Sequence, residues 1–253
     1  MPAGDYLFSI DIGYLIHLPY NTLKTKNFKK KVLRFIKRFC IFFFVSTIGT
    51  ALLYRFVPPP VTPLMCIRVV GQAFDNDALK LKKDWVSLDA ISNNLVMAVI
   101  ASEDNHFNEH YGFDFEAIQK AAKMNKHSKR LRGASTITQQ TAKNVFLWPD
   151  RTWLRKGLEV YFTLLIETTW SKKRIMEVYL NVIEMGNGIY GAEMASQTYF
   201  GKSAKNLTKR EAALIAAVLP NPRRWNPAHP SAYVQRKQSR ILYVMSKLER
   251  VDY

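Results

Sequence analysis

Glu103 begins the first stretch of the chain whose residue types could do chemistry, the polar segment Glu103–Gly112 with the sequence EDNHFNEHYG. This segment directly follows an apolar run, so the Glu103 carboxylate is predicted to stand at the end of an apolar helix. A carboxylate in that position can face a cleft while partly withdrawn from water, which suits a general base. An ordinary solvated helix end fits the same residues, and the segment alone leaves both interpretations open.

The same segment carries a second pattern, because His106, Glu109 and His110 have the H-x-x-E-H spacing of a class of zinc peptidases. So short a pattern arises readily by chance, and zinc needs a further ligand from elsewhere in the chain. No other His-rich or acidic cluster stands out as its source, and Gly112 follows closely enough to interrupt a helix. We therefore expect His110 to have a structural role near a turn, without zinc.

A second group, Gly133–Asn144, reads GASTITQQTAKN and has the composition of a helix start. Its first glycine permits a tight turn, and Ser135 is predicted to cap the helix that follows. Thr136, Gln140 and Lys143 are spaced to share one helical face. Hydroxyl, amide and ammonium groups on one face near a helix N-terminus suit a phosphate, and a solvated polar face is the simpler alternative.

A third group is the segment Arg155–Glu159, with the sequence RKGLE. On a helix, Arg155 and Lys156 would each share a face with Glu159. The plainest interpretation is a surface ion pair that contributes only ~0.3–0.5 kcal/mol. The segment by itself does not require anything more.

The elements that would position these three groups are predicted to be mainly helices. Ser92 is predicted to cap the helix that ends near Glu103, and Asp114 to cap the next one. A capping box begins another helix at Thr208, and a basic amphipathic helix is expected over Ala232–Leu248. Strand signals are confined to two short segments, Cys66–Val70 and Trp85–Leu88. We therefore predict a single α-dominated domain.

A membrane anchor is predicted from Phe39 to Val57, an apolar run whose one charge is Arg55. Its length is close to the ~20 residues of a spanning helix. The preceding Lys24–Arg38 contains eight basic residues and no acid, which predicts a cytoplasmic N-terminus and a domain outside the cytoplasm. A cleaved signal peptide is the alternative, but the run is long and no convincing cleavage site follows it. The predicted organisation is a basic cytoplasmic segment, a transmembrane helix and one domain, at residues 1–38, 39–57 and 58–253.

The formal net charge of +17 indicates an anionic partner, which could be a nucleic acid, an anionic lipid or a phosphorylated substrate. Hydrophobic residues make up 48% of the chain, enough to bury a core, so global disorder is not expected. A nucleic-acid binder would need a basic surface free of acids, whereas the main domain mixes both signs. We therefore expect no nucleic-acid partner.

Taken together, the three groups resemble the signature of the peptidoglycan glycosyltransferase family 51, which also forms the glycosyltransferase domain of class A penicillin-binding proteins. Glu103–Gly112 matches E-D-x-x-F-x-x-H-x-G, and Gly133–Asn144 matches G-x-S-T-I-x-Q-Q-x-x-K-N. The motifs R-K-x-x-E and Y-L-N follow in the family's order at Arg155–Glu159 and Tyr179–Asn181. The resemblance spans roughly residues 88–230, and the joint coincidence of these motifs is implausible.

The resemblance implies a lysozyme-like, mostly α-helical domain with a small membrane-facing jaw, acting outside the cytoplasm on lipid II and the growing glycan strand. It implies that Glu103 is the general base and that Glu159 is the second catalytic carboxylate. It also implies a substrate-binding set around the pyrophosphate, namely Ser135, Gln140, Lys143, Asn144, Arg151, Arg155 and Lys156. An inverting displacement needs a base on one face of the sugar, and a departing pyrophosphate needs charge neutralisation on the other. A divalent cation, Mg or Mn, could assist, with no metal-binding side chain assigned and no organic cofactor.

A lysozyme-like lytic murein hydrolase is the rival interpretation, since it also uses a glutamate on a helical scaffold. A hydrolase that acts on finished strands has no need of the lysine and arginine group, which favours the polymerase. The sequence contains no S-x-x-K, so no transpeptidase activity is expected. The expected location is the bacterial cytoplasmic (inner) membrane, where membrane lipids and other cell-wall synthesis proteins are the expected partners.

Overall fold

The computed structural model describes residues 22–75, 78–126 and 133–253, and it is mostly helical. The α-dominated fold predicted from the sequence is therefore confirmed. The chain divides into two compact units, Met1–Gly49 and Thr50–Tyr253.

The first helix, α1 (Thr22–Tyr54), includes a stretch, Phe28–Tyr54, that is long and apolar enough to cross a membrane. It is the one such helix in the described ranges. It starts earlier than the span predicted from Phe39, because lysine and arginine are good helix formers and continue the helix through the basic segment. It ends before the predicted Val57, ahead of three consecutive prolines that disfavour helical backbone.

The last turn of α1 belongs to the second unit, where it is held by side chains of that unit. Ala51 is fully buried, and its carbonyl oxygen accepts a hydrogen bond from Trp170 Nε1 at 2.8 Å. Arg174 donates to the carbonyl oxygens of Tyr54 and Val57 at 2.9 and 3.0 Å. The bonds from Arg174 to Tyr54 satisfy a backbone oxygen that the end of the helix leaves without an intrahelical partner.

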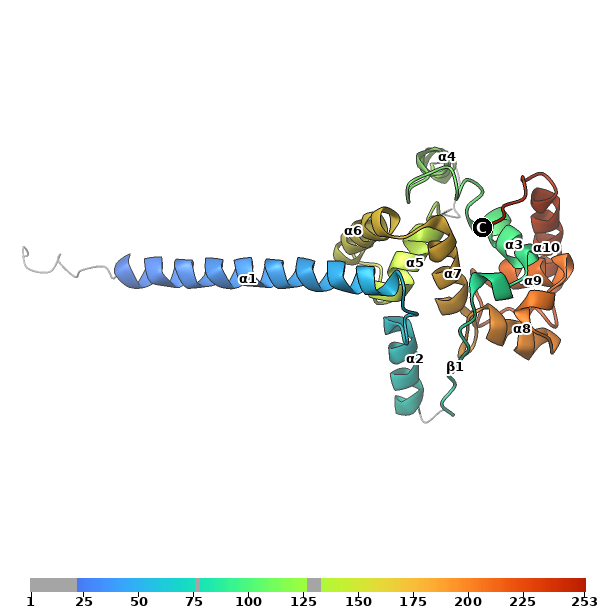
Figure 1. Ribbon diagram of the computed structural model, residues 1–253, viewed down its shortest axis with the longest axis horizontal. Coiled ribbons are helices and arrows are strands. Elements are labelled where there is room, and N and C mark those ends of the chain that lie inside the picture. Colours follow the sequence, from blue (N-terminus) through green and yellow to red (C-terminus); the bar gives the residue numbers. More distant parts are fainter. Residues whose placement is uncertain (1–21, 76–77, 127–132) are drawn as a thin grey trace, which may run out of the picture. The chain divides into compact units, whose positions relative to one another are not determined.

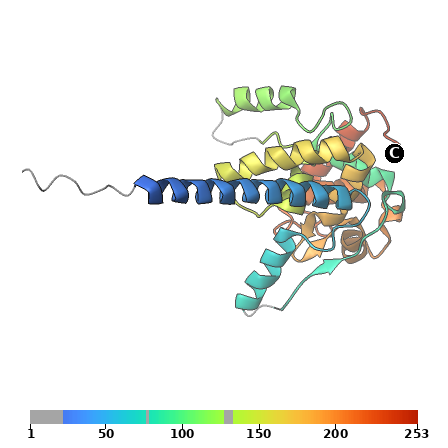
Figure 2. The ribbon, with the colours of Figure 1, turned by 60° about the vertical axis from the view of Figure 1, so that its left-hand side comes forward.

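Within its described residues the second unit contains nine further α-helices, and two short 3-10 helices at Leu88–Ala90 and Ala204–Asn206. Figure 1 labels the α-helices. They are α2 (Pro63–Phe74), α3 (Asn93–Glu103), α4 (Phe115–Asn125), α5 (Ile137–Phe146), α6 (Trp153–Thr169), α7 (Lys172–Val182), α8 (Ala192–Phe200), α9 (Lys209–Val218) and α10 (Ala232–Met245). The predicted caps Ser92, Asp114 and Thr208 are confirmed, since each side chain accepts a backbone N–H at the start of its helix. Figure 2 shows α2 and α4 projecting from opposite sides of the unit.

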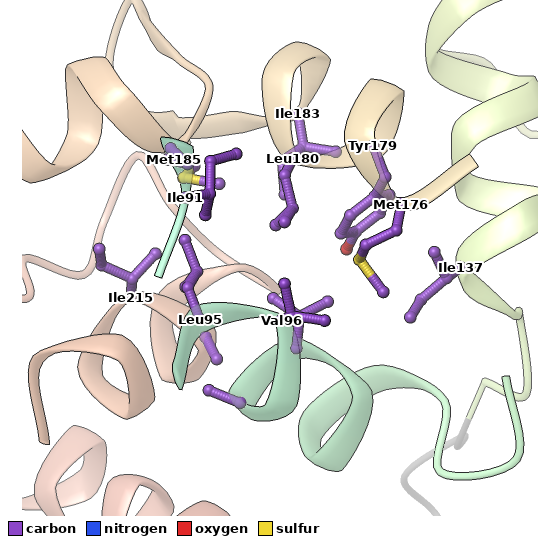
Figure 3. Packing of buried hydrophobic residues seen from close by; sticks show 14 of the residues in the cluster. Ile91, Leu95, Val96, Ile137, Met176, Tyr179, Leu180, Ile183, Met185 and Ile215 are labelled. Atoms are coloured by element: carbon purple, nitrogen blue, oxygen red, sulfur yellow. The ribbon is translucent and has the colours of Figure 1, made fainter. Parts of the chain in front are cut away.

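The core of this unit lies between α3 and its neighbouring helices. α3 packs against α9 and α10, and α5 packs against α6 and α7. Figure 3 shows Leu95 and Val96 of α3 facing Met176, Tyr179 and Leu180 of α7, and all five are buried. Burial of this apolar surface, worth roughly 25 cal/mol per Å², fixes the ends of α3 and α5 beside each other.

The strands differ from the prediction. Cys66–Val70 lies in α2, because Thr62 caps this helix and Pro63 occupies its first turn. Trp85–Leu88 forms no strand. The sheet instead has the order β1-β3-β2, from β1 (Lys82–Lys83), β2 (Glu184–Gly186) and β3 (Ile189–Tyr190). The dipeptide Asn187-Gly188 joins β2 to β3, and Gly188 has the positive φ of 71° that suits a two-residue hairpin turn.

Candidate active site

Glu103 is the last residue of α3, as predicted, and it is half-buried. Its Oε1 accepts a hydrogen bond from Ser102 Oγ at 3.2 Å, and its Oε2 accepts one from Gln140 Nε2 at 3.0 Å. Gln140 lies on α5, so the carboxylate of one helix is oriented by the amide of another. Two donors hold the carboxylate in place and leave lone pairs for a substrate proton.

Tyr179 fixes the orientation of Gln140. Its side chain is buried on α7, and its hydroxyl donates to Gln140 Oε1 at 3.3 Å. Burial raises the pKa of Tyr179 well above its ordinary value, and the charges of Glu103 and Asp104 act in the same direction. The phenol therefore stays protonated and donates to the amide oxygen, which turns the amide nitrogen toward Glu103.

Asp104 joins the end of α3 to the start of α5. Its Oδ2 accepts the backbone N–H of Ile137 at 3.0 Å, and its two carboxylate oxygens lie 2.9 and 3.1 Å from Nε2 of His110. A carboxylate is favourable at a helix N-terminus, where the backbone N–H groups are unpaired. This junction brings the polar face of α5 within reach of Glu103.

The cap of α5 is Thr136 and not Ser135, so the predicted cap is wrong by one residue. Thr136 and Gln139 form a reciprocal capping box, and the Thr136 hydroxyl also donates to the carbonyl oxygen of Gly112 at 2.7 Å. Thr136 is thereby buried, and its hydroxyl is engaged by the Gly112 carbonyl oxygen and the backbone N–H of Gln139. The physical reason is the glutamine three residues after Thr136, which completes the capping box.

The two histidines of the H-x-x-E-H pattern contact different carboxylates. His110 pairs with Asp104, whereas His106 Nδ1 lies 3.2 Å from Asp114 Oδ2. The hydrogen bond to Asp114 raises the pKa of His106. Both imidazoles thus have structural partners. The described part of the chain contains no group of three or more His, Cys, Asp or Glu residues that could hold a metal ion.

Glu159 lies inside the unit and is only 3% exposed, so the alternative of a solvated surface ion pair, which the segment alone left open, does not hold. Its Oε2 accepts a hydrogen bond from Arg155, which is 8% exposed, and its Oε1 accepts one from Lys156. A buried carboxylate needs such partners, because removal of a charge from water costs several kcal/mol. Arg155 and Lys156 thus form a cationic group that is organised by one buried carboxylate.

Lys143 connects the two glutamates electrostatically. Partial burial lowers the pKa of this lysine, and the charges of Arg155 and Lys156 lower it further. The charges of Glu159 and Glu103 both oppose this shift. One ammonium group therefore interacts with both carboxylates, beside two other cations. An anion bound at this place would relieve the repulsion among the three positive charges.

A pocket of about 160 Å³ opens beside Gln140, Lys143 and Asn144 of α5. It is lined by Leu64, Gln140, Lys143, Asn144, Tyr179, Ile183, Glu184, Leu219 and Pro222. The structure thus brings three predicted substrate-binding residues into one pocket. Ser135 and Arg151 are exposed, and no hydrogen bond or ion pair in the described ranges joins either side chain to this group.

The sequence interpretation missed several lining residues. Tyr179 belongs to the Y-L-N motif, which could have marked it as part of the site. Glu184 precedes the dipeptide Asn187-Gly188, a strong hairpin signal that would have placed it on a strand. Leu64, Leu219 and Pro222 come from distant segments, and no local pattern indicates that they reach this pocket.

Among the residues that the structure describes, no set of side chains fits a divalent cation held by the chain alone. Both carboxylate oxygens of Glu159 already accept hydrogen bonds from cations. Hard divalent cations require several oxygen ligands, and Mg²⁺ is often held by one or two carboxylates together with substrate phosphates.

Comparison with known proteins shows one family. The family model described as Transglycosylase matches residues 71–246. A biosynthetic peptidoglycan transglycosylase of Bdellovibrio bacteriovorus is 60% identical over 209 residues, which are 83% of this chain and 84% of the relative. Proteins with the same name from Bacteroides thetaiotaomicron and Haemophilus influenzae are 59% and 54% identical, covering 86% and 83% of this chain and 88% and 85% of the relatives. By sequence and by the motifs that form its pocket, the chain belongs to the transglycosylase family.

Proposed function

We propose that this chain polymerises peptidoglycan glycan strands from lipid II, a lipid-linked disaccharide-peptide. A sugar hydroxyl of the acceptor attacks the anomeric carbon of the donor and forms the new β-1,4 bond. The bond from that carbon to the pyrophosphate breaks, and polyprenyl diphosphate leaves as an anion. The hydroxyl proton goes to the base, so atoms and charges balance.

Glu103 is the base in this proposal. Its carboxylate is half-buried and fixed by Ser102 and Gln140. A base held in one orientation can accept the proton as the hydroxyl attacks, without first reorganising.

The cationic group stabilises the leaving pyrophosphate. The observation that carries the proposed function is the position of Lys143, which lines the pocket and interacts with both Glu103 and Glu159. Lys156 and Arg155 add positive charge, and Glu159 holds them in place. Groups oriented before the reaction toward developing negative charge supply a large share of catalysis. Asn144, Ser135 and Arg151 are proposed to contact the donor at the edges of this group.

A divalent cation in this proposal joins the site through the substrate. Because the oxygens of Glu159 are engaged, Mg²⁺ or Mn²⁺ would be carried mainly by the pyrophosphate oxygens. It would supply additional neutralisation of the leaving group.

The experiment that tests the function is incubation of the purified full chain with lipid II, followed by separation of the products by size. A polymerase gives a ladder of glycans longer than one disaccharide. A lytic hydrolase would instead shorten finished strands and leave lipid II unpolymerised, and that result would reverse the assignment.

The chain is proposed to be a single-pass protein of the bacterial cytoplasmic membrane, with the N-terminus in the cytoplasm and the catalytic unit outside. The apolar stretch Phe28–Tyr54 and the excess of basic residues before it support this orientation. Membrane lipids, the growing glycan strand and other cell-wall synthesis proteins are the proposed partners.

A reporter that is active only outside the cytoplasm tests this topology. Fused after Tyr253, it is expected to give full signal, whereas a cytoplasmic reporter at the same position should stay silent. The opposite pattern in a well-expressed fusion would overturn the orientation.

A further inference from the structure

Glu184, which lines the pocket, belongs to a group of three side chains, here called the polar cluster: Arg68 of α2, Glu184 of β2 and Tyr190 of β3. Arg68 Nη2 donates to Glu184 Oε2 at 3.2 Å. Glu184 and Tyr190 are cross-strand partners, which places their side chains side by side. The Glu184 side chain is 9% exposed and Tyr190 is fully buried.

The polar cluster concentrates unpaired polar atoms. Six buried side-chain nitrogen or oxygen atoms in the described part of the chain have no hydrogen-bond partner. Three of these six are Arg68 Nε, Glu184 Oε1 and Tyr190 OH. Buried polar groups are almost always hydrogen-bonded, and an unpaired one destabilises the fold. Half of the unpaired atoms thus lie together beside the proposed catalytic pocket, which points to a ligand that pairs with them.

The chemistry of the polar cluster limits that ligand. Burial, reinforced by the charge of Glu184, raises the pKa of Tyr190 to about 12, so its hydroxyl is a donor at neutral pH. Arg68 Nε is also a donor, whereas Glu184 Oε1 is an acceptor. The Glu184 carboxylate would repel a phosphate, and Arg68 would repel a cation. A secondary amide, with its N–H and its carbonyl, matches this mixed set of donors and acceptor.

We propose that the polar cluster binds a secondary amide of the substrate, with Glu184 accepting the N–H and Arg68 and Tyr190 donating to the carbonyl. This inference rests on the proposed function. Peptidoglycan precursors carry such amides in two places, the acetamido groups of their amino sugars and the bonds of their stem peptide. Glu184 lines the same pocket as Lys143, and Arg68 and Tyr190 adjoin Glu184 without lining that pocket. None of the three belongs to the cationic group, so the contribution of this subsite can be measured separately.

Glu184→Ala is expected to raise the KM for lipid II about tenfold, as loss of a hydrogen bond to a charged group predicts, with kcat within a few-fold of wild type. Direct binding of fluorescent lipid II in detergent should weaken by the same factor. Glu249→Ala is the matched control, because Glu249 is an exposed glutamate of the C-terminal segment. An unchanged KM and Kd in Glu184→Ala would overturn the proposal.

Two altered substrates identify which amide is bound. One is lipid II with N-deacetylated sugars, and the other is the lipid-linked disaccharide without its stem peptide. If the acetamido group is the ligand, the wild type should bind the deacetylated substrate about tenfold less tightly, and Glu184→Ala should cause no further loss on it. If instead Glu184→Ala causes no further loss of binding on the peptide-free substrate, the ligand is an amide of the stem peptide. If Glu184→Ala weakens the binding of both altered substrates by the same factor as it weakens the binding of lipid II, the cluster recognises neither amide and the proposal is contradicted.

Tyr190→Phe separates a binding role from a structural one. It removes only the unpaired hydroxyl, so the variant should unfold at the same temperature as wild type or higher, while binding lipid II several-fold more weakly. A lower unfolding temperature with unchanged binding would show that the hydroxyl has a structural partner such as water, and would overturn the proposal.

Failure of the wild type to polymerise lipid II would defeat the proposed function, and the binding assay would still test the subsite.

Discussion

Glu103→Gln is expected to polymerise lipid II about 10²–10⁴-fold more slowly than wild type while binding it nearly normally. The substitution keeps the shape of the side chain and deletes its basicity. Gln140 can still donate to the remaining amide oxygen, and the Ser102 hydroxyl can accept from the new amide nitrogen, so the geometry of the site should persist. The measurement is the initial rate of strand synthesis and the Kd for lipid II, determined on the same preparation.

Tyr179→Phe is the companion variant, because it leaves Glu103 intact and removes the hydroxyl that orients Gln140. We expect a smaller fall in kcat, and no further fall when Tyr179→Phe is added to Gln140→Ala, since the two residues act through one hydrogen-bonded chain. Polymerisation by Glu103→Gln within a few-fold of wild type would remove Glu103 as the base. The proposed mechanism would then be wrong.

Lys143→Met is expected to lower the rate of polymerisation by about 10²–10³-fold, as loss of a group that stabilises transition-state charge predicts. The variant should nevertheless be as stable as wild type or more stable. Burial holds the pKa of Lys143 below its unfolded value, so at neutral pH the folded state is penalised for keeping this lysine charged. That penalty disappears as pH rises past both pKa values, and it also disappears with the methionine.

Thermal unfolding of Lys143→Met and of wild type, measured between neutral and alkaline pH, tests whether the substitution stabilises the fold. The gap in stability should be largest at neutral pH and should close as the lysine deprotonates. Lys209→Met serves as the control, because Lys209 is an exposed lysine at the start of α9. A Lys143→Met enzyme with near-normal rates would eliminate the pyrophosphate role, whereas a large loss of stability would mean that Lys143 supports the fold.

Glu159 provides the contrast to Glu103, since it organises Arg155 and Lys156 instead of taking a proton. Glu159→Gln should weaken donor binding and alter the response to divalent cations, as well as the rate. An effect confined to kcat would assign Glu159 to proton transfer, contrary to our proposal.

The sequence by itself determined features whose causes are local. The caps at Ser92, Asp114 and Thr208 were predictable, because a side chain bonds to a backbone N–H two or three residues away. The apolar stretch of α1 was recognisable from its length and composition. The four spaced motifs indicated the family, and the matching Transglycosylase model confirms it.

Local rules also account for two of the errors. Ser135 and Thr136 are both acceptable caps, and the choice depended on the capping box with Gln139. The apolar segment Cys66–Val70 suits either a helix or a strand, and Thr62 and Pro63 favour the helix.

Only the tertiary structure decided which of the motif residues act together. Tyr179, Gln140 and Glu103 belong to three helices, and their hydrogen bonds exist because core packing sets α3, α5 and α7 side by side. The burial of Glu159 could not be predicted from the sequence either, since the sequence of a helix does not say which of its polar residues another element will cover. The environment of a charge depends on the dielectric and the neighbours that folding assembles around it, and these come from distant parts of the chain.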